Sequence, residues 1–139
     1  QGVLLEGLGT FCTVQEPLSL GAEGVLMVRR PIFKLGMQMV WPQGLTCPKV
    51  TLPDGIQIEP LNYQLLSLVT SLPRRVVEAC VEETIHLFSF HLENKKHVAF
   101  AFRDIGVLTR QGDTLCMTFY ASCLQRLERR ASLFAALRT

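Results

Sequence analysis

The chain has 139 residues, of which 48% are apolar and 19% charged, enough to bury a core in one domain or two small ones and too apolar for disorder. Its formal net charge of +2 is too small for a protein that wraps nucleic acid. Charged residues interrupt the apolar runs, so none approaches the roughly 20 residues that a membrane helix needs. The first residues lack the pattern of a secretory signal, and we expect a cytoplasmic protein.

Residues 1–41 are expected to form the strand-rich part of a first unit. Apolar runs and glycine turns predict three strands, at residues 3–6, 10–15 and 24–30. A short helix is predicted over residues 35–40. Residues 42–59 are rich in proline and are predicted to be a connector, with one short strand at 57–58.

Residues 60–139 form a more complete second unit. Helical spacing predicts a first helix from about Leu61 to Leu72, and a longer one from about residue 74 to Asn94, with Pro73 in its first turn. Strands are predicted at 97–103, 106–110 and 113–120, and a last helix over 121–137. On the longer helix the predicted buried stripe consists of Val76, Val77, Cys80, Val81, Thr84, Leu87, Phe88 and either His91 or Leu92.

A glycine phrase occurs twice, each time after an apolar strand. The copies are Gly7-Leu8-Gly9-Thr10-Phe11 and Asp104-Ile105-Gly106-Val107-Leu108. The order of elements around them predicts an α+β repeat of two related units, the first without its opening helices.

This order, with Gly7 to Phe11 at the first hairpin and Pro31-Ile32-Phe33-Lys34-Leu35-Gly36 at the end of the third strand, resembles the bacterial DNA-bending proteins HU and integration host factor. More specifically, the two copies resemble the tandem HU-fold region of the coiled-coil domain-containing protein 81 family. The resemblance implies units that pair, within one chain or between chains. The opening helices of the first unit then lie upstream, come from another chain, or are absent.

The resemblance also implies two basic β-arms around DNA, and here the sequence departs from it. The first arm, residues 15–24, keeps a proline but has two acids and no base, and the second has shrunk to residues 111–113. Phosphate contacts supply most nonspecific affinity for DNA, so DNA bending is disfavoured.

Two sets of side chains are candidate sites. For protein partners, such as tubulin or other centrosomal or ciliary components, the candidates are Arg29, Arg30, Lys34, Trp41, Arg126, Arg129 and Arg130. For a nucleic-acid face they are Arg29, Arg30, Lys34, Arg103 and Arg110. Because neighbours on a strand face opposite ways, only one of Arg29 and Arg30 can point to a given surface. Solvated charges remain the plainer interpretation for the arginines, and packing onto the first unit for Trp41.

No motif indicates catalysis, a metal or a cofactor. His86, His91 and His97 lie five and six residues apart, which is not the spacing of ligands on one helical face. The five cysteines lack a CxxC pair and are expected to be free and mostly buried. We therefore expect a non-enzymatic interaction module of a cytoskeletal assembly, centrosomal or ciliary by resemblance. The alternative is a DNA-binding module of HU type with reduced arms.

Overall fold

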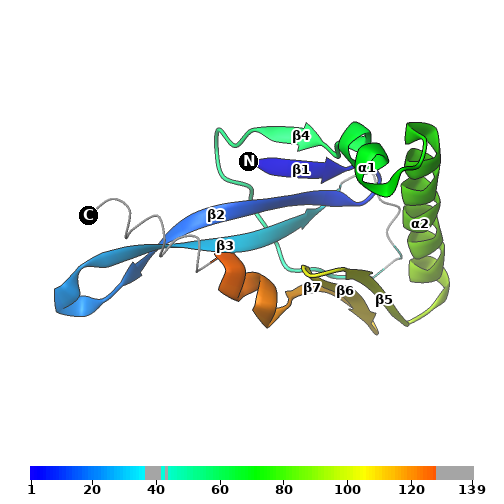
Figure 1. Cartoon of the computed structure of the whole chain (residues 1–139). Coiled ribbons are helices and arrows are strands. Elements are labelled where there is room, and N and C mark those ends of the chain that lie inside the picture. Colours follow the sequence, from blue (N-terminus) through cyan, green and yellow to red (C-terminus); the bar gives the residue numbers. More distant parts are fainter. Residues whose placement is uncertain (37–41, 43, 128–139) are drawn as a thin grey trace.

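The computed structural model describes residues 1–36, 42 and 44–127 of the chain, and shows two antiparallel hairpin systems with a helical pair at one end (Figure 1). The first system consists of β1 (Gly2–Leu5), β2 (Gly9–Ser19) and β3 (Val25–Leu35), with a single 3-10 turn, η1 (Gly21–Glu23), at its tip. After the connector come β4 (Ile58–Pro60), α1 (Tyr63–Thr70) and α2 (Arg74–Asn94). The second system consists of β5 (His97–Phe102), β6 (Gly106–Gln111) and β7 (Thr114–Phe119), followed by helical residues 121–127. The predicted α+β class is confirmed.

The strands form two sheets. One has the order β3-β2-β1-β4, in which β4 runs parallel to β1, and the other has the order β5-β6-β7. The connector touches both sheets, because Thr46 forms a parallel bridge with Thr114 on β7 before the chain reaches β4. In that bridge the Thr46 amide donates to the Asp113 carbonyl oxygen over 2.7 Å, and the Leu115 amide donates to the Thr46 carbonyl oxygen over 2.8 Å.

The first hairpin turns of the two systems have the same geometry. The Leu8 amide donates to the Leu5 carbonyl oxygen, and the Ile105 amide to the Phe102 carbonyl oxygen, both over 3.0 Å. Each turn contains one residue with a left-handed backbone, Gly7 at φ 84° and Asp104 at φ 62°. The repeated glycine phrase therefore corresponds to a repeated local structure.

The last glycine of each phrase is fixed by close backbone approach. A Cβ on Gly9 would lie 2.3 Å from the Lys34 carbonyl oxygen, and a Cβ on Gly106 would lie 2.5 Å from the Thr118 carbonyl oxygen. Both values are far below contact distance, so only glycine fits at these positions.

The core lies where α2 meets both sheets. Leu8 and Phe33 come from the first sheet, Leu108 and Leu115 from the second, and Phe88 from α2. Phenylalanines add contacts between the sheets: the rings of Phe11 and Phe102 lie 4.9 Å apart, edge to face. Because both sheets share one core with α2, the two systems are packed as one body.

The predicted buried stripe of α2 is partly wrong. The buried residues are Val77, Ile85, Phe88 and Leu92. Val76 and Leu87, predicted to be buried, are exposed, and Ile85 was not predicted. The helix carries apolar residues on two sides, and the sheets cover only one of them.

Several boundaries also differ from prediction; α1, for example, is shorter than the predicted helix from Leu61 to Leu72. Strands β2 and β3 pair as far as Ser19 and Val25, so the predicted loop of residues 15–24 is reduced to residues 20–24. Leu35, predicted to begin a short helix, is the last residue of β3, and residues 37–40 lie outside the described part of the chain. Pro73 precedes α2 as its N-cap instead of lying in its first turn. The last helix is described over residues 121–127 only.

Among the described helices, none is long and apolar enough to cross a membrane.

Candidate interaction surfaces

The β2–β3 hairpin extends into an arm that has no counterpart in the β6–β7 hairpin. The paired residues Val14 and Arg30 of the β2–β3 hairpin correspond in position to Gln111 and Thr114 of the β6–β7 hairpin. Between Gln111 and Thr114 lie only Gly112 and Asp113. We call residues 15–29 the arm; its tip is the end of the molecule farthest from α2 (Figure 1). The predicted short turn of the second hairpin is confirmed.

The surface of the arm is apolar and acidic. Val25 is 66% exposed, Met27 47% and Leu18 49%. Its acids are Glu16 and Glu23, and Arg29 is its single base. At the base of the arm the Arg30 guanidinium lies 2.5 Å from a carboxylate oxygen of Glu16, with both side chains about half exposed. The arm therefore carries one partly buried base, Arg29, against two acids, and offers no continuous cationic surface.

The three basic candidates on β3 do not act together. The register places Lys34 opposite Thr10 and Arg30 opposite Val14 on one face of the hairpin. Arg29 lies on the other face, partly buried, and its Nε donates no hydrogen bond to any described residue. Lys34 is also partly buried.

Two of the arginines from the second unit are engaged within the chain. Arg110 is only 6% exposed; its Nε donates to the Gly112 carbonyl oxygen over 2.8 Å, and its Nη1 donates to the Leu92 carbonyl oxygen in the last turn of α2. The Arg126 guanidinium donates to the carbonyl oxygens of Ser122 and Asp104. Arg110 thus does not lie on an open sheet face.

Of the remaining candidates, Arg103 is the most open. Its side chain is 97% exposed, with the Asp104 carboxylate 4.0 Å away. Trp41, Arg129 and Arg130 lie outside the described residues.

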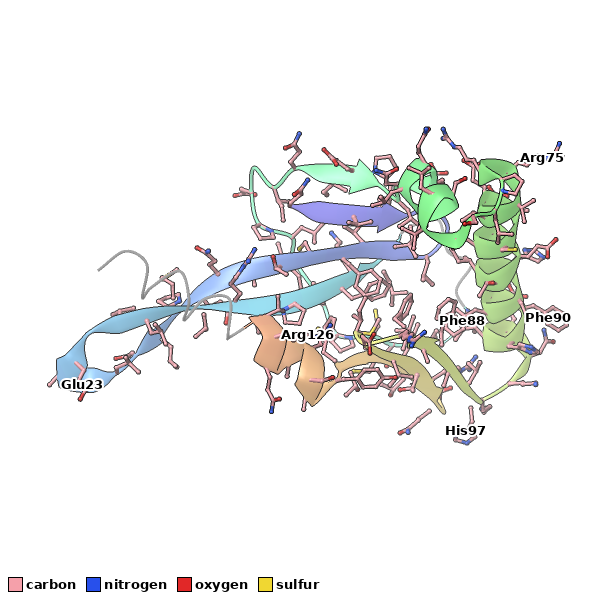
Figure 2. All side chains as sticks on the ribbon, in the orientation of Figure 1. Glu23, Arg75, Phe88, Phe90, His97 and Arg126 are labelled. Atoms are coloured by element: carbon pink, nitrogen blue, oxygen red, sulfur yellow. The ribbon has the colours of Figure 1, made fainter. Side chains whose placement is uncertain are left out.

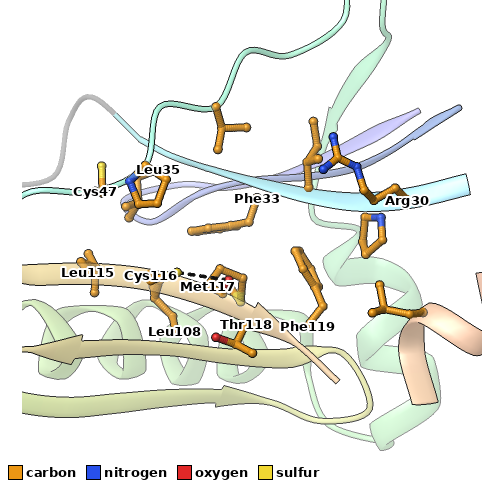
Figure 3. A pocket seen from close by; sticks show the side chains of 15 residues that line it. Arg30, Phe33, Leu35, Cys47, Leu108, Leu115, Cys116, Met117, Thr118 and Phe119 are labelled. Atoms are coloured by element: carbon orange, nitrogen blue, oxygen red, sulfur yellow. Dashed lines mark hydrogen bonds between the residues drawn. The ribbon is translucent and has the colours of Figure 1, made fainter. Parts of the chain in front are cut away.

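A cleft of about 410 Å³ separates β3 from β7, the facing edge strands of the two sheets. Figure 3 shows Phe33 and Leu35 on one side, and Leu115, Met117 and Phe119 on the other. Arg30 supplies the single charged side chain of its lining. Such a cleft suits an apolar group and carries no set of groups for catalysis.

The apolar character of the longer helix indicated a partner surface, but the sequence did not identify which residues of the helices are exposed. The exposed residues are Leu65, Leu68, Val69 and Leu72 on and after α1, and Val76, Leu87 and Phe90 on α2. The signal was present as a second apolar stripe on α2, which the sequence analysis merged with the buried one.

Tyr63 and Cys12 have pKa values raised above their ordinary values. Burial raises the pKa of the Tyr63 phenol, and the nearby carboxylates of Glu82, Glu78 and Glu6 raise it further. Burial also raises the pKa of the Cys12 thiol. Within the described ranges no three His, Cys, Asp or Glu side chains gather as metal ligands would.

All five cysteines are free, as predicted, but the prediction that most are buried is wrong. Only Cys12 is buried, while Cys47 and Cys80 are exposed. Cys80 lines a shallow hollow on α2 with the exposed residues Leu87 and Phe90, away from the buried side of the helix.

The chain matches one family model. The model for the CCDC81 eukaryotic HU domain 2 matches residues 57–130, just over half of the chain. The match begins next to β4 and includes both helices and the second sheet. The resemblance stated from the sequence is therefore confirmed over this region.

Proposed function

This chain belongs to the family of the CCDC81 eukaryotic HU domain 2, and from that membership we propose that it is a non-enzymatic protein-interaction module of a cytoskeletal, centrosomal or ciliary, assembly. The proposal includes two HU-like units, with the predicted divisions at 1–41, 42–59 and 60–139. Protein contacts, not DNA, are its proposed purpose.

The hairpin geometry supports the two-unit organisation. Beyond the shared first turns, the Gly36 amide donates to the Leu8 carbonyl oxygen, and the Tyr120 amide to the Ile105 carbonyl oxygen, both over 2.9 Å. The same hydrogen bond thus ends the third strand in both sheets. The two units differ in the hairpin before that bond, because β2–β3 is longer than β6–β7.

The arm is the observation that carries the choice of protein over DNA. Minor-groove binding needs cations along the arm, because phosphate neutralisation provides the main sequence-independent attraction. Here the arm shows Leu18, Val25 and Met27 to solvent, and the nearby Arg30 is held by Glu16. An exposed apolar ribbon gains most from covering by another protein surface.

An armless variant provides the test. Replacing residues 15–29 with Gly-Asp would give the β2–β3 hairpin the turn that the β6–β7 hairpin already has. We expect the armless variant to fold, as judged by its circular dichroism, and to lose neighbours in proximity labelling in ciliated cells relative to the full chain. Unchanged labelling would count against the proposal.

A DNA titration addresses the alternative function. We expect no binding of labelled duplex by the full chain at about 50 mM salt in an anisotropy assay. Tight binding that falls steeply between about 50 and about 200 mM salt would instead establish a nucleic-acid module. Arg103→Ala and Lys34→Ala would then identify its contacts.

A further inference from the structure

The side of α2 that faces away from the sheets carries a regular apolar stripe. Val76, Cys80, Glu83, Leu87 and Phe90 follow one another at intervals of four, three, four and three residues, the spacing of side chains that pack against another helix. Leu87 and Phe90 are each 55% exposed. Figure 2 shows Phe88 on the side of α2 toward the sheets and Phe90 on the opposite side.

These side chains line a hollow. Cys80, Glu83, Thr84, His86, Leu87 and Phe90 surround a shallow depression of about 510 Å³. The Thr84 hydroxyl donates to the Cys80 carbonyl oxygen over 2.6 Å, so it makes no demand on a ligand. Glu83 is exposed and forms no ion pair with a described residue, so its carboxylate is available in the middle of the stripe.

The neighbouring helix presents a second apolar stripe. Leu65, Leu68 and Val69 recur at the spacing of one helical face, and all three are exposed, Leu68 by 73%. Leu72, just after the end of α1, is exposed as well. The two helices pack against each other.

The charge of this region is acidic. Between residues 76 and 94 the chain has four glutamates and neither lysine nor arginine. Glu78 and Glu82 lie close enough to Tyr63 to raise its pKa, together with Glu6. Arg74 is occupied by Glu78, with Nε 3.1 Å from a carboxylate oxygen. Exposed bases stand only at the two ends of this stretch, Arg75 before it and Lys95 and Lys96 after it, so the acidic charge belongs to the middle of the helix. A cation on a partner would be complementary in charge to Glu83 there.

The position of Glu83 argues against a second copy of the chain as that partner. Glu83 is the middle residue of the stripe, so a twofold axis at the centre of the stripe would bring the Glu83 carboxylates of two copies together. Like charges brought together at the centre of an apolar interface are unfavourable.

We propose that the outward stripe of α2, from Val76 to Phe90, binds a basic amphipathic helix of a partner protein. An apolar side chain of that helix occupies the hollow between Leu87 and Phe90, and a lysine or arginine beside it pairs with Glu83. This inference rests on the proposed interaction function and names the kind of partner.

A pair of designed peptides tests it with the full 139-residue chain. Each is a helix of about 20 residues with leucines at three- and four-residue spacing; one carries lysines on its flanks and the other glutamates. We expect the lysine peptide to bind at least about tenfold more tightly by fluorescence anisotropy. Leu87→Asp with Phe90→Asp should abolish its binding, whereas Met27→Asp on the arm should not change it. Circular dichroism checks that each variant is folded.

Charge reversal provides the sharper readout. Glu83→Lys should lower affinity for the lysine peptide and raise it for the glutamate peptide, reversing the preference. Equal binding of both peptides, or no binding of either, would overturn the inference. So would a concentration-dependent dimer of the full chain in sedimentation that Leu87→Asp dissolves, because a second copy would then be the partner.

The failure of this inference is distinguishable from failure of the proposed function. If the peptides do not bind but the armless variant loses its cellular neighbours, only the helical site is refuted. If both peptide binding and arm-dependent labelling are absent, the interaction function itself is refuted.

Discussion

Arg110 is the residue for which the structure most changes the expectation, and its replacement gives the most informative stability measurement. We expect Arg110→Met to destabilise the chain, because methionine keeps an apolar stem in the buried position but makes neither hydrogen bond. The Leu92 and Gly112 carbonyl oxygens would lose their donors. A buried acceptor left without a partner costs about 1–3 kcal/mol, and the interaction of a cation with the C-terminal end of a helix adds about 0.3–1 kcal/mol.

These contributions oppose the gain from no longer burying a charge. Arg110 is 6% exposed, and no carboxylate of the described residues lies within ion-pair distance of it, so among these residues its desolvation is offset by carbonyl dipoles. Replacing buried charges with apolar groups recovers about 1–4 kcal/mol in favourable cases. We take the two lost hydrogen bonds as the larger effect, since charge-assisted bonds contribute about 1.5–3 kcal/mol each, and expect a net loss of about 2 kcal/mol.

Urea denaturation followed by circular dichroism measures this loss directly. The matched control is Arg103→Met, which removes a side chain that is 97% exposed and should change stability by less than about 0.5 kcal/mol. If Arg110→Met were as stable as the parent chain, the two hydrogen bonds would not support α2. If Arg103→Met were the more damaging variant, the assignment of buried and open arginines would be reversed.

Three further outcomes are expected. Gly9→Ala and Gly106→Ala should each lose about 3 kcal/mol in the same denaturation assay, because the new methyl group meets a backbone oxygen, while Gly36→Ala, whose nearest atom would lie 3.4 Å away, should be nearly neutral. Ser71→Gly should raise the melting temperature slightly, by an amount equivalent to about 0.5–1 kcal/mol, since Ser71 ends α1 with φ 58°; a lower melting temperature would contradict this. Because the pKa of Tyr63 is higher in the folded chain than its ordinary value of 10.0, the unfolded chain releases the proton first and stability should fall as pH rises above about 10; Tyr63→Phe should lose less stability over that range, and parallel pH profiles would refute the shift.

Local signals predicted the local structure well. Pro73 and the end of apolar periodicity near Asn94 gave the bounds of α2 to within a residue, because proline and helical spacing act within a few residues. The glycine phrase predicted both hairpins, since close backbone contacts at Gly9 and Gly106 require glycine.

Tertiary contacts were what the sequence could not predict. Val76 and Val77 are adjacent and equally apolar, yet only Val77 is buried, because the sheets cover one side of α2. Arg110 looked like a solvent-facing cation, and its burial depends on the end of α2 lying beside β6. Strands β2 and β3 were predicted too short: Pro17, a residue unusual inside a strand, pairs opposite Met27 within the hairpin.

The region matched by the family model depends on contacts with residues that precede it in the chain. The family match begins at residue 57, yet β4 pairs only with β1, and α2 packs on Leu8 and Phe33, all encoded earlier in the chain. A protein made from residues 57–130 would contain the whole matched region and still lack Leu8 and Phe33, which help to cover its core. The region matched by the family model is thus shorter than the segment that folds cooperatively. We expect residues 57–130, separated from the strands before them, to be unstable.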